Sequence, residues 1–256
     1  MRPYILSETN LKSVRENPPQ LAVLPWGATE CHNLHLPYGT DTIAVTRIGE
    51  KVCQGAWEQG AKVYLLPTMA FGVNTNMLAF PLVMNMNPTT QLAVLKDVVN
   101  NLKSAGVRKL LILNGHGGND FNPLQRELFD SGVFIAACSW YTVCADVAGR
   151  IFEHRGDHAD EMETSVGLHL FADLVAPLSQ ADEGKIRTTR FAAVNEGWVT
   201  ITRPWDKLTT NSGVGNPYKA TSDKGRKYIH AVVEKLTPFV VEFAKAEMDG
   251  MFPYVP

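Results

Sequence analysis

The chain has 256 residues, of which 45% are hydrophobic and 20% are charged, and its formal net charge is −2. These values are typical of a soluble globular protein, and the small net charge argues against a surface built to bind nucleic acid or an anionic membrane. No apolar run reaches the length of a membrane span, and the first residues lack the pattern of a secretion signal. We therefore expect a cytoplasmic protein with a single domain over residues 1–256.

The hydrophobic pattern predicts strands that alternate with helices. Buried strands are expected over residues 21–26, 62–67, 107–114 and 133–138. Helices are expected over residues 42–60, 88–105, 122–131, 157–171 and 222–248, with one or two short strands over residues 191–202. Residues 68–87 show no clear period, and a loop of that length usually forms a binding element or the wall of a site. The alternation predicts an α/β fold with a parallel sheet and helices on both of its faces.

The first cluster of polar residues follows the strand predicted at residues 21–26. Glu30 and His32 are two residues apart, so an extended backbone would point both side chains to one face. They would then lie at the carboxyl end of the strand, where open α/β sheets bind their ligands. Asp41 follows after a Pro/Gly turn and adds a second carboxylate. This ligand set suits zinc, manganese or iron, although a solvated polar loop could carry the same residues.

The second cluster is the glycine-rich turn at residues 114–119, which follows another predicted strand. Backbone N–H groups of such a turn can bind phosphate, so a nucleotide- or sugar-phosphate-binding α/β protein is the alternative function. The spacing matches neither of the common phosphate-binding motifs, and His116 stands where these motifs need bare backbone. The turn therefore favours a metal-binding histidine at His116, although a helix-capping turn with an incidental histidine would have the same sequence.

The third cluster spans residues 157–163 and holds four carboxylates around His158. Crowded carboxylates repel one another unless a cation or a proton neutralises them. In a helix, Glu161 and Glu163 would point in different directions, so only one of them is expected to meet a metal ion. Alone, this segment resembles a common acidic helix start. Together, the three clusters predict a metal site assembled from three loops at one edge of the sheet.

In this order, the clusters resemble the signatures of the creatininase (creatinine amidohydrolase) family. The matching segments are Glu30-x-His32-x-x-His35-Leu36-Pro37…Thr40-Asp41, residues 114–119, residues 158–165 and residues 213–217. The resemblance covers nearly the whole chain. It implies a three-layer α/β/α sandwich with a mostly parallel central sheet, two divalent metal ions per subunit, and a homohexamer. It also implies hydrolysis of a C–N bond in a small cyclic or linear amide.

The resemblance further implies roles for individual residues. Glu30 and His116 would bind one metal ion. His32 would bind the other, and Asp41 would bridge the pair. His158 matches a histidine that transfers protons near the scissile bond, and Asp157 lies where creatininase has a glutamate. Glu163, Asn119 and His35 match positions that would orient the metal ligands.

The chain also departs from creatininase at positions that affect the site. Creatininase has a glutamate ligand where this chain has Gly118, and many relatives keep a glutamate at the position of Glu161 instead. We therefore expect Glu161 to complete the second metal site and to take part in catalysis. The loop differs at Asn74, Asn76-Met77 and Leu82-Val83, which alters the expected substrate more than the chemistry. The expected function is a metal-dependent amidohydrolase for which creatinine is a poor substrate, with a catalytically inactive family member as a further alternative.

Overall fold

The computed structural model describes residues 1–154 and 156–255, so Arg155 and Pro256 lie outside the described residues. The strands are β1 (Leu21–Trp26), β2 (Val63–Leu65), β3 (Lys109–Asn114) and β4 (Phe134–Ser139). The α-helices are α1 (Leu11–Glu16), α2 (Thr40–Glu58), α3 (Pro88–Ser104), α4 (Asn122–Glu127), α5 (Ala145–Ile151), α6 (Glu161–Leu170), α7 (Ala192–Asn195), α8 (Trp205–Leu208) and α9 (Ser222–Lys245). Short 3-10 helices are η1 (Leu6–Glu8), η2 (Phe129–Ser131), η3 (Trp140–Thr142), η4 (Ala172–Leu174) and η5 (Leu178–Gln180).

The four strands form one parallel sheet in the order β2-β1-β3-β4. The chain builds β2 at one side of β1 and then crosses over to place β3 at the other side, so the strand order reverses between β1 and β3. Trp26 pairs with Asn114, and Asn114 pairs with Ser139, so β1, β3 and β4 end at the same level. Ligands of open α/β sheets bind beyond the carboxyl ends at such a reversal.

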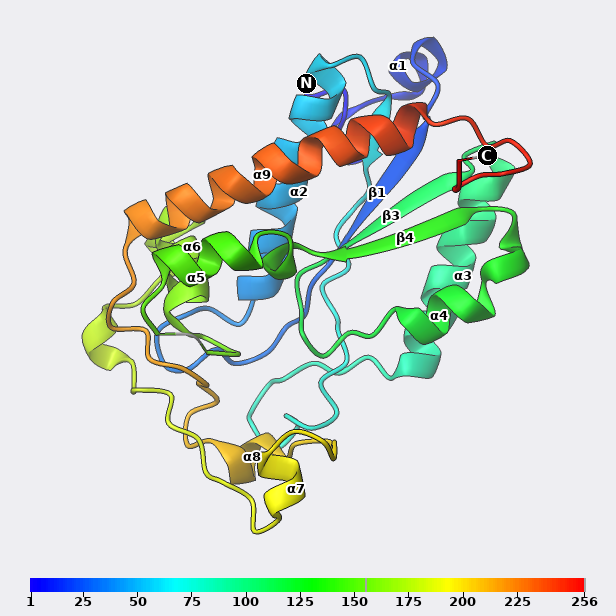
Figure 1. The fold of residues 1–256 in the computed structure, drawn as a ribbon. Coiled ribbons are helices and arrows are strands. Elements are labelled where there is room, and N and C mark those ends of the chain that lie inside the picture. Colours follow the sequence, from blue (N-terminus) through cyan, green and yellow to red (C-terminus); the bar gives the residue numbers. More distant parts are fainter. Residues whose placement is uncertain (155, 256) are drawn as a thin grey trace.

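Two helical layers cover the two faces of the sheet (Figure 1), with α2, α5, α6 and α9 on one side and α3 and α4 on the other. Leu21 and Val23 of β1 join the core cluster that contains α2 and α9, whereas Ala22 and Leu24 join the cluster that contains α3. Since side chains alternate along a strand and both faces are covered, every residue of β1 and β3 is buried. This is the expected α/β/α sandwich.

The helices that border the site begin at side-chain caps. Asp160 accepts a hydrogen bond from the backbone N–H of Glu163 at 3.0 Å, so α6 begins immediately after Asp160. Thr221 caps α9 in the same way through the backbone N–H of Lys224, at 3.2 Å. The two helices cross so closely that a Cβ on Gly225 would lie 1.9 Å from the carbonyl oxygen of Ser165.

The predicted strands in the sheet and the long helices agree with the structure to within a few residues, but three local expectations are wrong. β1 ends at Trp26, so Glu30 and His32 lie in the loop after the strand and not on an extended continuation of it. The helix expected from residue 157 begins at Glu161, because Asp160 caps it. Residues 191–202 contain the short helix α7 in place of the expected strands.

Two further observations complete the fold. None of the helices formed by residues 1–154 and 156–255 is long and apolar enough to cross a membrane. The segment that carries α7 and α8 lies apart from the three layers, at the bottom of the view in Figure 1.

Candidate metal centre

Three buried side chains meet beyond the ends of β1 and β3. Glu30 lies in the loop after β1, His116 follows β3, and Asp41 belongs to the first turn of α2. His116 Nδ1 lies 2.8 Å from Glu30 Oε1 and 3.1 Å from Asp41 Oδ2. One possible ligand atom from each residue lies within 4.8 Å of the others, which is close enough for all three to contact one ion.

A second group of three forms on the other oxygen of Asp41. His32 Nε2 lies 3.1 Å from Asp41 Oδ1 and 3.9 Å from Glu163 Oε2, and these ligand atoms again lie within 4.8 Å of one another. Glu163 comes from the first turn of α6. Asp41 thus faces a histidine with each of its oxygens, which is the arrangement of a residue shared by two adjacent groups.

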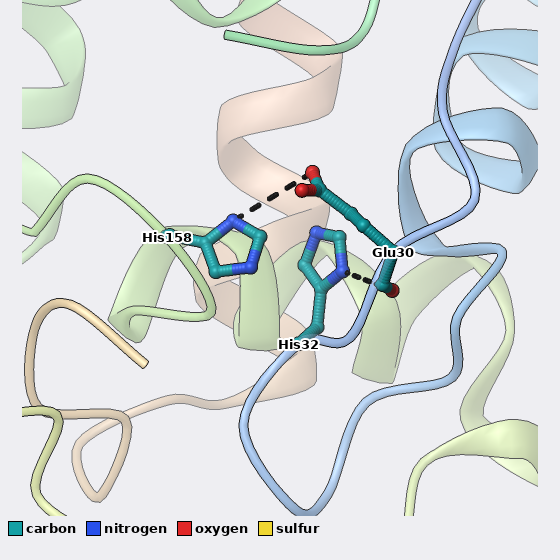
Figure 2. Close-up of side chains that lie close together, drawn as sticks. All are labelled: Glu30, His32 and His158. Atoms are coloured by element: carbon teal, nitrogen blue, oxygen red, sulfur yellow. Dashed lines mark hydrogen bonds and ion pairs between the residues drawn. The ribbon is translucent and has the colours of Figure 1, made fainter. Parts of the chain in front are cut away.

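His158 completes the centre from the loop before α6. Its Nδ1 lies 3.9 Å from Glu30 Oε1, and its ring centroid lies 4.0 Å from that of His32. Figure 2 shows these three side chains converging, with the Glu30 carboxylate pointing toward His158. They form a third group whose ligand atoms lie within 4.8 Å of one another.

The three histidines are oriented in the same way, because the ring nitrogen that points away from the centre contacts a backbone carbonyl. The contacts are His32 Nδ1 with Glu30 O at 3.1 Å, His116 Nε2 with Val73 O at 3.1 Å, and His158 Nε2 with Cys31 O at 2.8 Å. A carbonyl oxygen only accepts hydrogen bonds, so each outer nitrogen carries the proton and donates it. The inner nitrogen then presents its lone pair to the centre, as a metal ligand must.

This arrangement brings acceptors together without a donor between them. Glu30 Oε2 and Asp41 Oδ2 are buried and have no hydrogen-bond partner among the described residues. Buried carboxylate oxygens facing histidine lone pairs repel unless a cation lies between them. The donor set of carboxylates and imidazoles therefore fits one or more divalent ions such as zinc or manganese.

The titration behaviour of the same residues shows how strongly the centre attracts positive charge. Burial lowers the pKa of His32, but the charge and hydrogen bond of Asp41 outweigh it and raise the pKa to about 10. Burial also lowers the pKa of His116, yet the Glu30 and Asp41 carboxylates raise it well above its usual value. Burial raises the pKa of Asp41, but the two histidines hold it well below its usual range. Without a metal ion, protons must supply this positive charge.

His158 and Glu163 have pKa values suited to proton transfer. Burial and the neighbouring His32 charge lower the pKa of His158 to about 4, so its Nδ1 is an unprotonated base at neutral pH. Burial raises the pKa of Glu163 to about 8, although the nearby His32 opposes this. Perturbed groups of this kind are typical of functional sites.

The structure places Glu161 away from this centre, against the expectation that it completes the second site. Its fully buried carboxylate accepts Lys224 Nζ at 2.5 Å and the backbone N–H groups of Glu153 and His154 at 2.9 and 2.7 Å. Side chains two positions apart in an α-helix are rotated by about 200° around the helix axis. Glu161 and Glu163 therefore point to nearly opposite sides of α6. Only one of them reaches the centre, as expected, but it is Glu163.

The turn after β3 orients His116 through its neighbours. Asn119 Oδ1 accepts the backbone N–H of Val73 at 3.1 Å, which fixes the segment whose carbonyl contacts His116. A Cβ on Gly118 would lie 2.3 Å from the carbonyl oxygen of Val73 and 2.4 Å from His116 Nε2. Gly118 therefore lets the Val73 carbonyl and the His116 ring approach each other. The position has no room for the glutamate that the resemblance to creatininase implies there. His35 Nε2 contacts Thr164 Oγ1 of α6 at 2.8 Å, behind the centre.

A cavity of about 500 Å³ opens next to the centre. Glu30, Asp41, His116, His158 and Glu163 line one part of it. The irregular loop expected to form a wall does so through Val73, Asn74, Asn76 and Met77, and the remaining wall includes Tyr141, Phe152, Asp157, Arg203 and Trp205. Asp157, an expected catalytic residue, lines the cavity, but its half-exposed carboxylate pairs with Arg203, 2.6 Å from its Nη1.

The sequence does not indicate the positions of three residues that line the cavity, Glu163, Arg203 and Trp205. The sequence predicts only an orienting role for Glu163. The signal for its place is Asp160, because a cap at that residue fixes where α6 begins and which side chains of its first turn share a face. Arg203 and Trp205 belong to an irregular segment with no motif, and their place at the cavity depends on contacts distant in the sequence. No local pattern marks them.

Comparisons with known proteins relate the whole fold to the creatininase family. The family model described as Creatininase, creatinine amidohydrolase, matches residues 6–240. A solved structure of a Bacteroides fragilis NCTC 9343 protein, provisionally named creatinine amidohydrolase, superposes with a TM-score of 0.88 at 38% identity and covers 97% of this chain and 99% of that one. The manganese form of creatininase gives a TM-score of 0.75 at 19% identity, with 95% and 99% covered, which shows a shared fold. A zinc form of a creatininase mutant gives 0.76 at the same identity.

Two curated relatives act on different substrates. The 3-dehydro-scyllo-inosose hydrolase of Thermotoga maritima is 29% identical over 177 residues, which are 64% of this chain and 55% of that hydrolase. This chain therefore spans about half the length of that relative. The mycofactocin precursor peptide peptidase of Mycobacterium tuberculosis is 28% identical over 247 residues, which are 90% of this chain and 87% of that peptidase.

Proposed function

Because the chain belongs to the creatininase family, we propose that it is a metal-dependent amidohydrolase that holds two divalent ions in a single domain of residues 1–256. The observation that carries the proposal is that Asp41 belongs to two adjacent groups of potential metal ligands. Glu30 and His116 would hold one ion, His32 and Glu163 would hold the other, and Asp41 would contact both. Zinc, manganese and iron suit these donors, and relatives are known in zinc and manganese forms.

The protein's own residues would position the substrate and move protons. Bound divalent ions supply a Lewis acid, which polarises an amide carbonyl and lowers the pKa of water. His158 Nδ1, unprotonated at neutral pH, accepts a proton from the attacking water and delivers it to the leaving nitrogen. The Cys31 carbonyl holds the His158 ring in the required tautomer. Trp205 packs against that ring with its centroid 4.9 Å away and keeps it in place.

The proposed substrate is a small cyclic or linear amide other than creatinine. A cavity of about 500 Å³ is the size of a small-molecule site. The wall formed by Asn74, Asn76 and Met77 departs from the loop that the family resemblance implies for creatininase, and two of the curated relatives are named for other compounds. Creatinine hydrolysis with kcat/KM at or above about 10⁴ M⁻¹s⁻¹ would contradict this part of the proposal.

The alternative of a phosphate-binding turn has less support. The backbone N–H of His116 donates to Asn114 Oδ1 within the turn, at 3.1 Å, and that of Asn119 donates to the His116 carbonyl. These N–H groups are therefore not directed at a ligand. A family member without turnover differs from the proposed enzyme only in activity, so a screen of small lactams, formamides and creatinine-like rings separates these two possibilities.

Metal analysis tests the central claim. Elemental analysis of the purified protein should give two divalent ions per subunit. Asp41→Asn keeps the shape but loses the negative charge, so occupancy should fall at both sites. Asp97→Asn changes an exposed aspartate of α3 and should leave occupancy unchanged. Full occupancy in Asp41→Asn would show that Asp41 does not serve both ions.

Assembly and location belong to the same proposal. By family resemblance, the chain would form a homohexamer in the cytoplasm and would need neither nucleic acid nor a membrane. Light scattering on the purified protein measures the mass directly, and a monomeric mass would contradict the hexamer.

A further inference from the structure

Arg203 is placed to choose the substrate. It lines the cavity that contains Glu30 and His158, and it is the only arginine or lysine among the described residues of the cavity wall. Its side chain is 47% exposed, so the guanidinium lies at the rim of the cavity and not in the protein core. A cation at this position faces whatever part of a ligand extends away from the metal centre.

Contacts with Asn76 and Trp205 fix the position of Arg203. Asn76 Nδ2 donates to the Arg203 carbonyl at 3.0 Å, and the Trp205 backbone N–H donates to the Asn76 carbonyl at 3.1 Å. The guanidinium lies over the Trp205 ring, 5.3 Å from its centroid, and the same ring packs against His158. Arg203 is thus held in a set orientation relative to His158, the proposed proton-transferring residue.

The ion pair of Arg203 with Asp157 is weak and exchangeable. Both side chains are about half exposed, at 47% and 51%, and such pairs contribute little to stability because water screens them. A guanidinium has five N–H donors in a planar fork that matches a carboxylate, and stacking on an aromatic ring pre-orients it. Asp157 therefore occupies a binding position that another carboxylate can take.

A second observation points to a ligand in the same cavity. Asn74 lines the cavity and is 1% exposed, yet its Oδ1 has no hydrogen-bond partner among the described residues. Its amide nitrogen donates to the Met84 carbonyl at 3.1 Å, which fixes the amide orientation and leaves Oδ1 as the acceptor. An unpaired buried acceptor is costly unless a ligand N–H or O–H satisfies it.

We propose that the substrate is an amide whose far end carries a carboxylate, and that Arg203 binds this carboxylate in place of Asp157 while Asn74 accepts a substrate N–H. An N-acyl amino acid has both groups. This inference rests on the proposed amidohydrolase function and deepens it, because it names the chemical class of the substrate. Asp157 then acts as the exchangeable partner that keeps Arg203 oriented when the cavity lacks a carboxylate.

A matched pair of probes tests the proposal. N-Acetylglycine and N-acetylglycinamide have nearly the same shape, but only the first is an anion. Titration calorimetry on the metal-loaded protein should show at least about tenfold tighter binding of N-acetylglycine, because hydrogen bonds to a charged group are the stronger ones. Arg203→Gln should remove this preference, and Arg203→Lys should restore part of it. Arg226→Gln, at an exposed arginine of α9, is the matched control and should keep it.

Asp157→Asn separates carboxylate binding from a merely structural ion pair. The variant removes the competing carboxylate, so N-acetylglycine should bind several times more tightly than to the unaltered protein. Equal binding of the two probes, no binding of either at millimolar concentration, or a preference that persists in Arg203→Gln would overturn the proposal. The last result would place the carboxylate at the metal ions instead. The metal content of the same samples reports separately on the proposed function, so the two failures are distinguishable.

Discussion

The Glu161 carboxylate lies 2.5 Å from the Lys224 ammonium and joins the start of α6 to the start of α9. Glu161 is fully buried, and it also accepts the backbone N–H groups of Glu153 and His154. The pair therefore ties both helices to the chain that leads into the His158 loop. These contacts give Glu161 a structural role at a position that does not face the metal centre.

Lys224→Met should destabilise the protein by about 2–3 kcal/mol, because it leaves the buried Glu161 carboxylate without its cation. Urea unfolding measures the change. Lys227→Met removes an exposed partner of Asp223 from the same helix and should cost less than about 0.5 kcal/mol. Equal effects of the two substitutions would show that burial of Glu161 does not matter.

Glu163→Gln should lower the metal content, since its carboxylate faces His32 and Asp41. Glu161→Gln should leave the metal content near that of the unaltered protein, because Glu161 points away from the centre. Elemental analysis of both variants decides the assignment. Loss of metal from Glu161→Gln alone, in a protein that remains folded by circular dichroism, would return the ligand role to Glu161.

The two adjacent glycines of the β3 turn should respond very differently to alanine. In Gly118→Ala the Cβ would meet the Val73 carbonyl and His116 Nε2 at 2.3 and 2.4 Å, so the hydrogen bond that orients His116 is lost. Metal affinity should fall by at least about tenfold, as when the partner of a ligating histidine is removed. In Gly117→Ala the nearest atom, the Tyr141 hydroxyl, lies 4.0 Å away, so affinity should be retained. Metal titration of both variants tests this, and similar affinities would contradict the packing argument.

Much of the fold follows from the sequence because its elements are long and periodic. The buried runs at β1 and β3 and the apolar faces of α2 and α9 depend on residues close together in the chain, so their pattern predicts them. The prediction of strands over residues 191–202 is wrong for the opposite reason. Their apolar side chains, such as Phe191 and Trp198, are mostly exposed, so the apolar residues that suggested strands do not belong to a core.

The sequence predicts the proposed metal ligands well where a motif fixes them, and poorly where the rotation of a helix decides which side chain faces the centre. Glu30, His32, Asp41 and His116 converge as expected, because parallel strands deliver their loops to one edge. The choice between Glu161 and Glu163 depends on which residue begins α6, and helix ends are the least certain part of any sequence-based prediction. Arg203 meets Asp157 across 46 positions, and such a contact leaves no local signal.

The stability of the metal-free protein should decrease with rising pH. His32 has its pKa raised from 6.5 to about 10, and Glu163 has its pKa raised from 4.5 to about 8, so both hold protons more tightly in the folded chain. A raised pKa contributes stability that is complete below the unfolded value and is lost as pH approaches the folded value. The free energy of unfolding in the presence of a chelator should therefore fall from about pH 6.5, the unfolded pKa of His32, to about pH 10, its folded pKa.

Metal-loaded protein provides the comparison for this pH dependence. Divalent ions replace the protons at the centre, so the decline over the same range should be smaller. Urea unfolding of the metal-free and metal-loaded forms, each at the lower and the upper end of this pH range, gives the four free energies of unfolding to compare. A chelator-treated protein that gains stability as pH rises would contradict the assigned pKa directions.

Gly225→Ala should disrupt the crossing of α6 and α9. The new Cβ would lie 1.9 Å from the Ser165 carbonyl oxygen, so the helices must separate. Overpacking of this kind costs about 1–3 kcal/mol or more, which thermal unfolding can measure. Gly250→Ala meets no atom within 4 Å and serves as the control. A Gly225→Ala protein as stable as the control would mean that the helices move apart freely.

The rim residue Arg203 lies in the long connection between α6 and α9, which contributes no strand among the described residues. The proposed metal ligands instead lie after β1 and β3 and in the first turns of α2 and α6, next to the sheet. Exposed positions of the connection, such as Arg203, can therefore change without moving these residues, whereas Trp205 and Val214 of the same connection contact His158. Over evolutionary time, a protein with this architecture can acquire a new substrate through changes at the exposed positions of this connection. The residues proposed to bind metal are then selected separately.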